Sequence, residues 1–179
     1  MGSIQWTEGQ FGANDFVIDG NSKHRRVTGA IWLPKTSSES NIVVLCGHGA
    51  SGDRYQDPIP YLVKHLVDQH NIVVLSIDGP VHGLRKVEPG GREAFFQEMQ
   101  RPTFIDDMIS DWLTAVEDIS KEKSITIETL GYFGLSMGTM FGVPLLASQL
   151  EFNASVIGLC GSSGAASMIG ERLLKDAEQ

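Results

Sequence analysis

Residues 130–138 read LGYFGLSMG, and this stretch decides the expected fold. Residues 130–135 have the composition of a buried strand, and a segment of helical period follows the motif. The turn between them has the pattern G-x-S-x-G, in which the serine adopts a strained backbone conformation. Larger side chains at Gly134 and Gly138 would collide with the adjoining helix and strand. The pattern therefore predicts that Ser136 is a nucleophile, and the alternative is a glycine-rich turn with an incidental serine.

Two backbone segments could stabilise negative charge beside Ser136. The helix expected after the turn points its first amides at the serine, so the N–H of Met137 is one candidate oxyanion donor. The glycine-rich loop 47–52 can turn a second N–H toward the same space, and Ala50 is the candidate there. In this loop His48 is either a general base or, as we favour, a side chain that holds the loop in shape.

Short β-branched runs alternate with longer segments of helical period along the chain. This alternation is typical of an α/β fold with a mostly parallel sheet and helices on both faces. Residues 16–18 and 27–33 predict two early strands in an antiparallel lead-in. Continuous apolar runs predict further strands that are buried on both faces. These runs are 42–45, 72–75, 130–135 and 154–159.

Helices are expected between these strands. Asp57 as N-cap and Pro58 in the first turn predict one helix, and a second is expected to open at Thr103 with a long apolar stripe. Further helices are expected over 137–150 and about 166–175.

Residues 86–102 lack a clear period and predict a long loop or a short lid. Phe95 and Phe96 in this region suggest an apolar wall beside the site, but they do not identify a substrate. No linker or repeat interrupts the chain, so we expect a single domain over 1–179.

Composition limits the expected partners. The 179 residues have a formal net charge of −8 and no dense basic run, so neither nucleic acid nor an anionic membrane surface is expected. No stretch has the pattern of a signal peptide or a membrane span, and a cytoplasmic location is the default expectation. Cys46 and Cys160 lie outside any metal-ligand spacing, so no metal site is expected.

Three motifs occur in an order that resembles the α/β-hydrolase superfamily: His48–Gly49, residues 77–83 (IDGPVHG) and residues 134–138. The resemblance covers nearly the whole chain and implies the α/β-hydrolase fold, with the nucleophile and oxyanion donors named above. The chain looks most similar to the dienelactone-hydrolase-like and related esterase branches. Dienelactone hydrolase itself has cysteine at the nucleophile position, so its substrate is not carried over.

Asp78 and His82 lie at the end of an expected central strand, where active-site residues gather in open α/β sheets. An aspartate before Gly-Pro can bond its own backbone, and a histidine in a glycine-flanked turn can brace a loop. We therefore favour a loop-shaping role for both, with catalysis by His82 as the alternative.

The triad of this fold runs in the order Ser, acid, His, yet no histidine follows Ser136. The acids that remain are Glu151, Glu171, Asp176 and Glu178. We expect the chain to be the N-terminal part of a longer hydrolase, with the last strands, the acid and the histidine beyond Gln179. The apolar run at 156–159 would then form an uncovered sheet edge, through which self-association is expected.

The leading hypothesis is a serine hydrolase that acts on an ester or related acyl bond of a small molecule, through an acyl-enzyme on Ser136 and without a cofactor. The alternative is a non-catalytic small-ligand-binding protein of the same fold, or an inactive fragment that lacks the triad acid and histidine. A third hypothesis is that His48 or His82 replaces the missing base.

Overall fold

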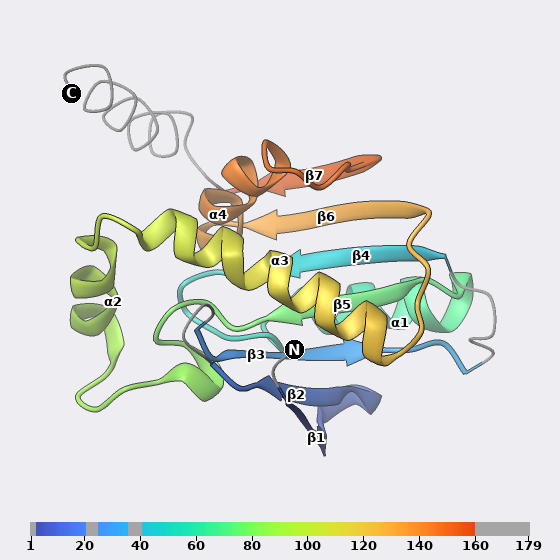
Figure 1. Ribbon diagram of the computed structural model, residues 1–179, viewed down its shortest axis with the longest axis horizontal. Coiled ribbons are helices and arrows are strands. Elements are labelled where there is room, and N and C mark those ends of the chain that lie inside the picture. The colour runs from blue at the N-terminus through green and yellow to red at the C-terminus, as the bar shows by residue number, and fades with distance from the viewer. Residues whose placement is uncertain (1–2, 21–24, 36–40, 160–179) are drawn as a thin grey trace.

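The computed structural model describes residues 3–20, 25–35 and 41–159. Within them the strands form one sheet in the order β1-β2-β3-β5-β4-β6-β7 (Figure 1). The first three strands pair antiparallel, β3 is also antiparallel to β5, and β5, β4, β6 and β7 are mutually parallel. The strands are β1 (Ile4–Glu8), β2 (Asn14–Ile18), β3 (Val27–Trp32), β4 (Ile42–Gly47), β5 (Val73–Ile77), β6 (Thr129–Leu135) and β7 (Ala154–Gly158).

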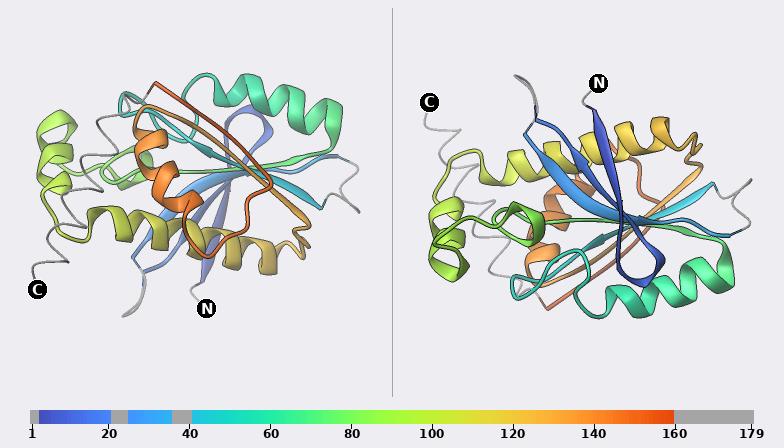
Figure 2. Two further views of the ribbon diagram at one scale, coloured as in Figure 1. Left: turned by 90° about the horizontal axis from the view of Figure 1, so that it is seen from above. Right: turned by 90° about the horizontal axis from the view of Figure 1, so that it is seen from below.

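Helices cover both faces of the sheet, as expected (Figure 2). Helix α1 (Ile59–His70) packs on one face, whereas α3 (Phe104–Glu122) and α4 (Met137–Leu146) share the other. Successive side chains of a strand point to opposite faces. Accordingly, Leu45 of β4 joins the core beneath α3 and α4, and the next residue, Cys46, joins the core beneath α1. Burial on both faces explains why the central strands are continuous apolar runs.

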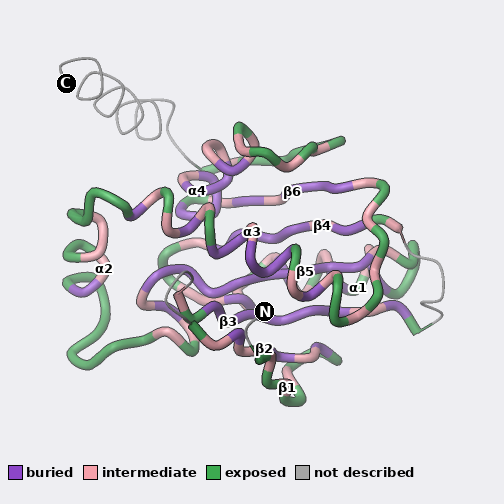
Figure 3. The backbone as a smooth tube through the Cα atoms, viewed as in Figure 1, coloured by how far each residue is buried: buried purple, intermediate pink, exposed green. Residues whose placement is uncertain are grey.

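The segment 86–102, expected as a loop or lid, contains a helix, α2 (Gly91–Met99). Its sequence, GREAFFQEM, is rich in helix formers, but only Ala94 is fully buried, so the segment lacks the apolar period that would reveal a helix. The tube in Figure 3 shows α2 as mostly exposed, in contrast to the buried β4 and β6.

Three further expectations differ from the structure at element boundaries. Strand β1 was not expected, and α1 is preceded by Pro58 rather than Asp57 as its cap. Helix α4 ends at Leu146, not at residue 150, because the chain turns at Ser148, whose hydroxyl accepts a hydrogen bond from the Leu150 N–H at 3.4 Å. The helix expected over about 166–175 lies outside the described residues. No helix in the described part of the chain is both long and apolar enough to cross a membrane.

Candidate active site

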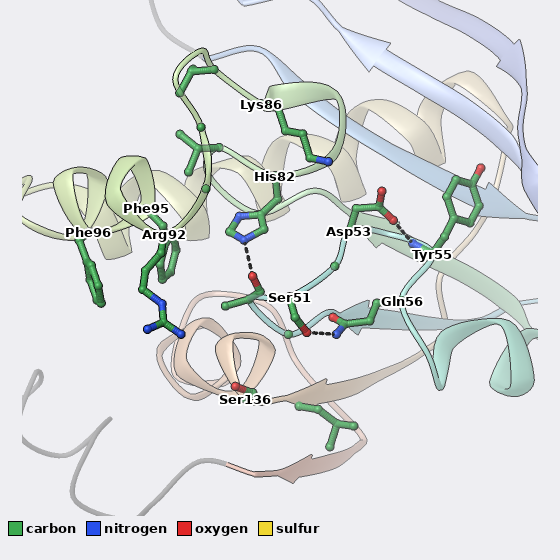
Figure 4. A pocket seen from close by; sticks show the side chains of 18 of the residues that line it. Ser51, Asp53, Tyr55, Gln56, His82, Lys86, Arg92, Phe95, Phe96 and Ser136 are labelled. Carbon is green, nitrogen blue, oxygen red and sulfur yellow. Dashed lines mark hydrogen bonds between the residues drawn. The ribbon is translucent and has the colours of Figure 1, made fainter.

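A cleft of about 1160 Å³ opens at the carboxyl ends of the parallel strands. One wall is the loop after β4, the opposite wall comes from the segment after β5 including α2, and the turn between β6 and α4 contributes Ser136 (Figure 4). This is where open α/β sheets place their ligand sites. The cleft brings together three predicted site residues, Ser136, Ala50 and His82, although 54 residues separate His82 from Ser136.

Ser136 has the backbone conformation expected of a nucleophile elbow. Its φ of 53° and ψ of −113° are strained for a residue with a side chain, and the residue is exposed in the cleft. Its carbonyl accepts hydrogen bonds from the N–H groups of Thr139 (2.9 Å) and Met140 (3.0 Å), and its own N–H donates to the Gly158 carbonyl (2.9 Å). Strand β7 and the first turn of α4 therefore hold the strained residue from both sides.

Gly134 and Gly138 are required by close packing between α4 and the sheet. A Cβ at Gly134 would lie 2.7 Å from the Gly138 carbonyl oxygen, and one at Gly138 would collide with the backbone of Gly47 at the end of β4. The buried hydroxyl of Tyr132 donates to the Gly138 carbonyl at 2.5 Å, and burial raises the pKa of this phenol well above its usual range. The hydroxyl is therefore a fixed donor beneath the elbow.

Thr139 is a part of the elbow that the sequence did not single out. Its hydroxyl lies 2.8 Å from the Gly134 carbonyl oxygen and 2.7 Å from that of Gly158, and it accepts a hydrogen bond from the Gly158 N–H at 3.1 Å. The side chain thus joins α4 to β6 and β7. No local sequence pattern indicates the contact with β7, because Gly158 lies 19 residues further along the chain.

His48 is buried beneath the loop after β4 and is fully hydrogen-bonded. Its Nε2 accepts a hydrogen bond from the Gly79 N–H (2.8 Å), so its Nδ1 carries the hydrogen and donates to the Gly49 carbonyl (2.8 Å). Burial, the strongest influence, lowers the pKa of His48 and favours this neutral form. With both nitrogens engaged, the ring holds the loop and has no lone pair free for Ser136.

His82 lies on the far side of the same loop, and both its ring nitrogens also face backbone carbonyls. Nδ1 is 2.6 Å from the Pro80 oxygen, and Nε2 is 3.0 Å from the Ala50 oxygen. Both ring nitrogens therefore point at backbone carbonyls of the loops, and neither is directed at Ser136.

Asp78 lies below the cleft and is fully buried, in a network that ties three segments together. Its carboxylate accepts hydrogen bonds from the Thr28 hydroxyl (2.6 Å), the Leu84 N–H (3.1 Å) and the Arg54 guanidinium (3.1 and 3.2 Å). The Arg54 guanidinium also binds Asp15 of β2, at 2.7 and 3.1 Å. Burial works against the charge of Arg54, but the two carboxylates outweigh it and raise its pKa.

The turn after Asp78 follows from this network. Gly83 has a φ of +51°, and a Cβ there would collide with the Asp78 carboxylate. The aspartate and glycine of the IDGPVHG motif are thus matched to each other. Arg54 was missed by the sequence analysis, because nothing near it in the chain indicates two carboxylate partners that lie 39 and 24 residues away.

The structure also locates Met137, the candidate oxyanion donor that follows Ser136. Met137 occupies the first position of α4, whose first-turn N–H groups have no partner within the helix. Its side chain is buried between the elbow and Gly79, rather than in the cleft.

No family model matches the sequence. Among solved structures, the chain is similar to a cold-adapted esterase from an Arctic intertidal metagenomic library, with a TM-score of 0.70 and 26% identity over 97% of this chain and 71% of that chain. An acetyl xylan esterase from Paenibacillus sp. R4 gives a TM-score of 0.66 and 16% identity over 94% of this chain and 58% of that chain. A thermostable carboxyl esterase from Bacillus coagulans gives a TM-score of 0.60 and 15% identity, over 99% of this chain and 52% of that chain. With the sheet order, the strained elbow and these neighbours in agreement, the chain has the α/β-hydrolase fold.

Proposed function

We propose that the protein is a serine hydrolase of a carboxylic ester or related acyl bond, with Ser136 as its nucleophile. The observation that carries the proposal is the strained, exposed Ser136 at the junction of β6 and α4, which lines the cleft of about 1160 Å³. The structural neighbours support it, because all three are esterases. The finer likeness to dienelactone-hydrolase-like esterases rests on residues 77–83 and on the lack of a large cap insertion in the sequence.

In the proposed reaction, the Ser136 Oγ attacks the carbonyl carbon of the ester while a base takes its proton. The N–H groups of Met137 and Ala50 would stabilise the oxyanion of the tetrahedral intermediate. Collapse of this intermediate breaks the bond to the alcohol, which leaves with the proton, and the acyl group stays on Ser136. Water then attacks the acyl-enzyme, releasing the acid and restoring the serine.

The base is the part of this mechanism that the described residues do not supply. Both ring nitrogens of His48 and of His82 face other groups, and no histidine follows Ser136 in the sequence. These contacts argue against replacement of the base by either histidine. The proposal therefore requires a histidine, and an acid that orients it, from outside the described residues.

The test is hydrolysis of p-nitrophenyl acetate by the full-length protein. Ser136→Ala should lower kcat by about 10³-fold or more, because the acyl-enzyme can no longer form. Ser110→Ala is the matched control, since Ser110 is an exposed serine of α3 outside the cleft lining. An unchanged rate in Ser136→Ala would remove this serine as the nucleophile. Saturable ligand binding without any turnover would favour the small-ligand-binding alternative.

A further inference from the structure

His82 lies where the two walls of the cleft meet. The side chain is buried, with the Ala50 carbonyl on one side and the Phe95 ring of α2 on the other. The Nε2 contact to the Ala50 oxygen spans 32 residues of sequence, and the His82 and Phe95 ring centroids are 5.3 Å apart in an edge-on arrangement. One side chain therefore touches both the loop after β4 and the helix opposite it (Figure 4).

The backbone on both sides of Ala50 is held by a histidine. His48 binds the carbonyl of the Gly49–Ala50 peptide, and His82 faces the carbonyl of the Ala50–Ser51 peptide. Both peptides are trans, so each N–H points away from the carbonyl of its own plane. By binding the Gly49 carbonyl, His48 sets the direction of the Ala50 N–H. His82 prevents rotation of the next peptide plane, Ala50–Ser51.

The ring of His82 is also part of a row of aromatic contacts through the site. Centroid distances are 5.4 Å from His48 to His82, 5.3 Å from His82 to Phe95, 5.9 Å from Phe95 to Phe104 and 5.0 Å from Phe104 to Phe141. The row runs from the loop after β4, through α2 and the start of α3, to α4. On helix α2, Ala94 is buried and both Phe95 and Met99 pack against the core, and Phe95 is the residue through which the helix joins this row of rings.

We infer that His82 is a positioning residue with two separable parts: its ring N–H fixes the Ala50–Ser51 peptide, and its ring anchors α2 through Phe95. The inference deepens the proposed function, because it matters for catalysis only if the Ala50 N–H binds the oxyanion. His82 thus connects the loop after β4, which contains Ala50, to α2 on the opposite wall of the cleft.

Two variants separate the two parts. His82→Phe keeps an aromatic ring against Phe95 and removes both ring nitrogens. His82→Gln keeps a donor able to reach the Ala50 carbonyl and removes the ring. Phe95→Leu removes the ring contact from the α2 side without altering His82. His65→Gln is the control, since His65 is a half-buried histidine of α1 outside the cleft lining.

Hydrogen exchange measured by mass spectrometry on the full-length protein without substrate reports on both walls of the cleft and needs no turnover. His82→Phe should speed exchange at residues 49–53 by at least tenfold and leave residues 91–99 within twofold of the wild type. His82→Gln and Phe95→Leu should instead speed exchange at residues 91–99 by at least tenfold and leave residues 49–53 within twofold of the wild type. Exchange unchanged at both segments in both His82 variants, or raised evenly along the chain, would overturn the inference. If a His82 variant does not fold, the Phe95→Leu pattern decides the α2 part alone.

Steady-state hydrolysis by the full-length protein provides the second readout. His82→Phe should lower kcat by about 10- to 100-fold with KM within twofold, as for a displaced oxyanion donor. His82→Gln should mainly raise KM, because the wall formed by α2 is loosened. The exchange pattern tests the positioning role even if Ser136→Ala shows that the proposed function is wrong.

Discussion

Single residues of two kinds set the geometry of the cleft: glycines where backbones touch, and buried charges where loops meet. Gly138 allows α4 to approach the end of β4, and this approach carries Ser136 to its exposed position. Arg54 lies between Asp15 and Asp78, and thereby ties the loop after β4 to β2 and to the end of β5. A buried ion pair stabilises little by itself, but a carboxylate left without its partner is costly.

Replacing Arg54 by Met should therefore lower the free energy of unfolding by about 3–5 kcal/mol, because two buried carboxylates lose their cation. Urea denaturation monitored by circular dichroism measures the change. Arg101→Met is the control: its side chain is 42% exposed, its ion pairs are with Glu98 and Asp107, and its loss should cost under about 1 kcal/mol. Equal effects of the two substitutions would show that the Arg54 network does not hold the loops.

At the scale of elements, α2 is the part of the site with the least support from the core. Ala94 is its one buried residue and Phe95 and Met99 pack against the core while partly exposed, whereas Arg92, Phe95 and Phe96 line the cleft. Phe96 is 53% exposed, so its ring is available to an apolar group of a substrate. Helix α2 is thus expected to shape substrate preference and to contribute little to the stability of the fold.

Phe96→Ala should raise KM for esters with apolar acyl chains by about 3- to 10-fold, equivalent to about 1 kcal/mol of lost burial, with kcat little changed. The thermal midpoint should stay within about 2 °C, because the ring packs little in the free protein. Tyr61→Ala removes a ring that is 63% exposed on α1 and lies outside the cleft lining, and it should change neither KM nor kcat. A fall of several degrees in the midpoint for Phe96→Ala would assign the ring to the core instead.

At the scale of the whole molecule, the strand order brings the loops after β4, β5 and β6 to one end of the sheet, although they are far apart in sequence. The same order makes β7 the edge strand of the described sheet. Val156 and Ile157 of this strand are 63% and 44% exposed. An exposed apolar edge strand is a template for pairing with a second chain.

We therefore expect the 179-residue chain to self-associate through β7, as light scattering over a concentration series would show. Ile157→Lys should shift the population toward the monomer, because a charge at an edge opposes strand pairing. Leu84→Lys is the matched control, since Leu84 is also 44% exposed but lies after β5. A monodisperse monomer of the unaltered chain would contradict the expectation.

The fold class and the elbow were predictable from the sequence because their causes are local. The continuous apolar runs reflect burial on both faces of a strand, and the spacing of Gly134, Ser136 and Gly138 reflects contacts within one strand–turn–helix unit. The likeness of the loop and turn motifs to those of the superfamily added the order of the segments around the site.

Only the tertiary structure decided what the polar side chains around the elbow do. From the sequence, His48 and His82 could each be a general base or a side chain that holds a loop. The structure decided between these roles by placing their hydrogen-bond partners, which lie 31 and 32 residues away. Arg54 and Thr139 had no signal, because their partners belong to other strands and loops. The physical reason is that periodicity records which face of an element is buried, whereas a hydrogen bond between distant segments depends on how the elements pack.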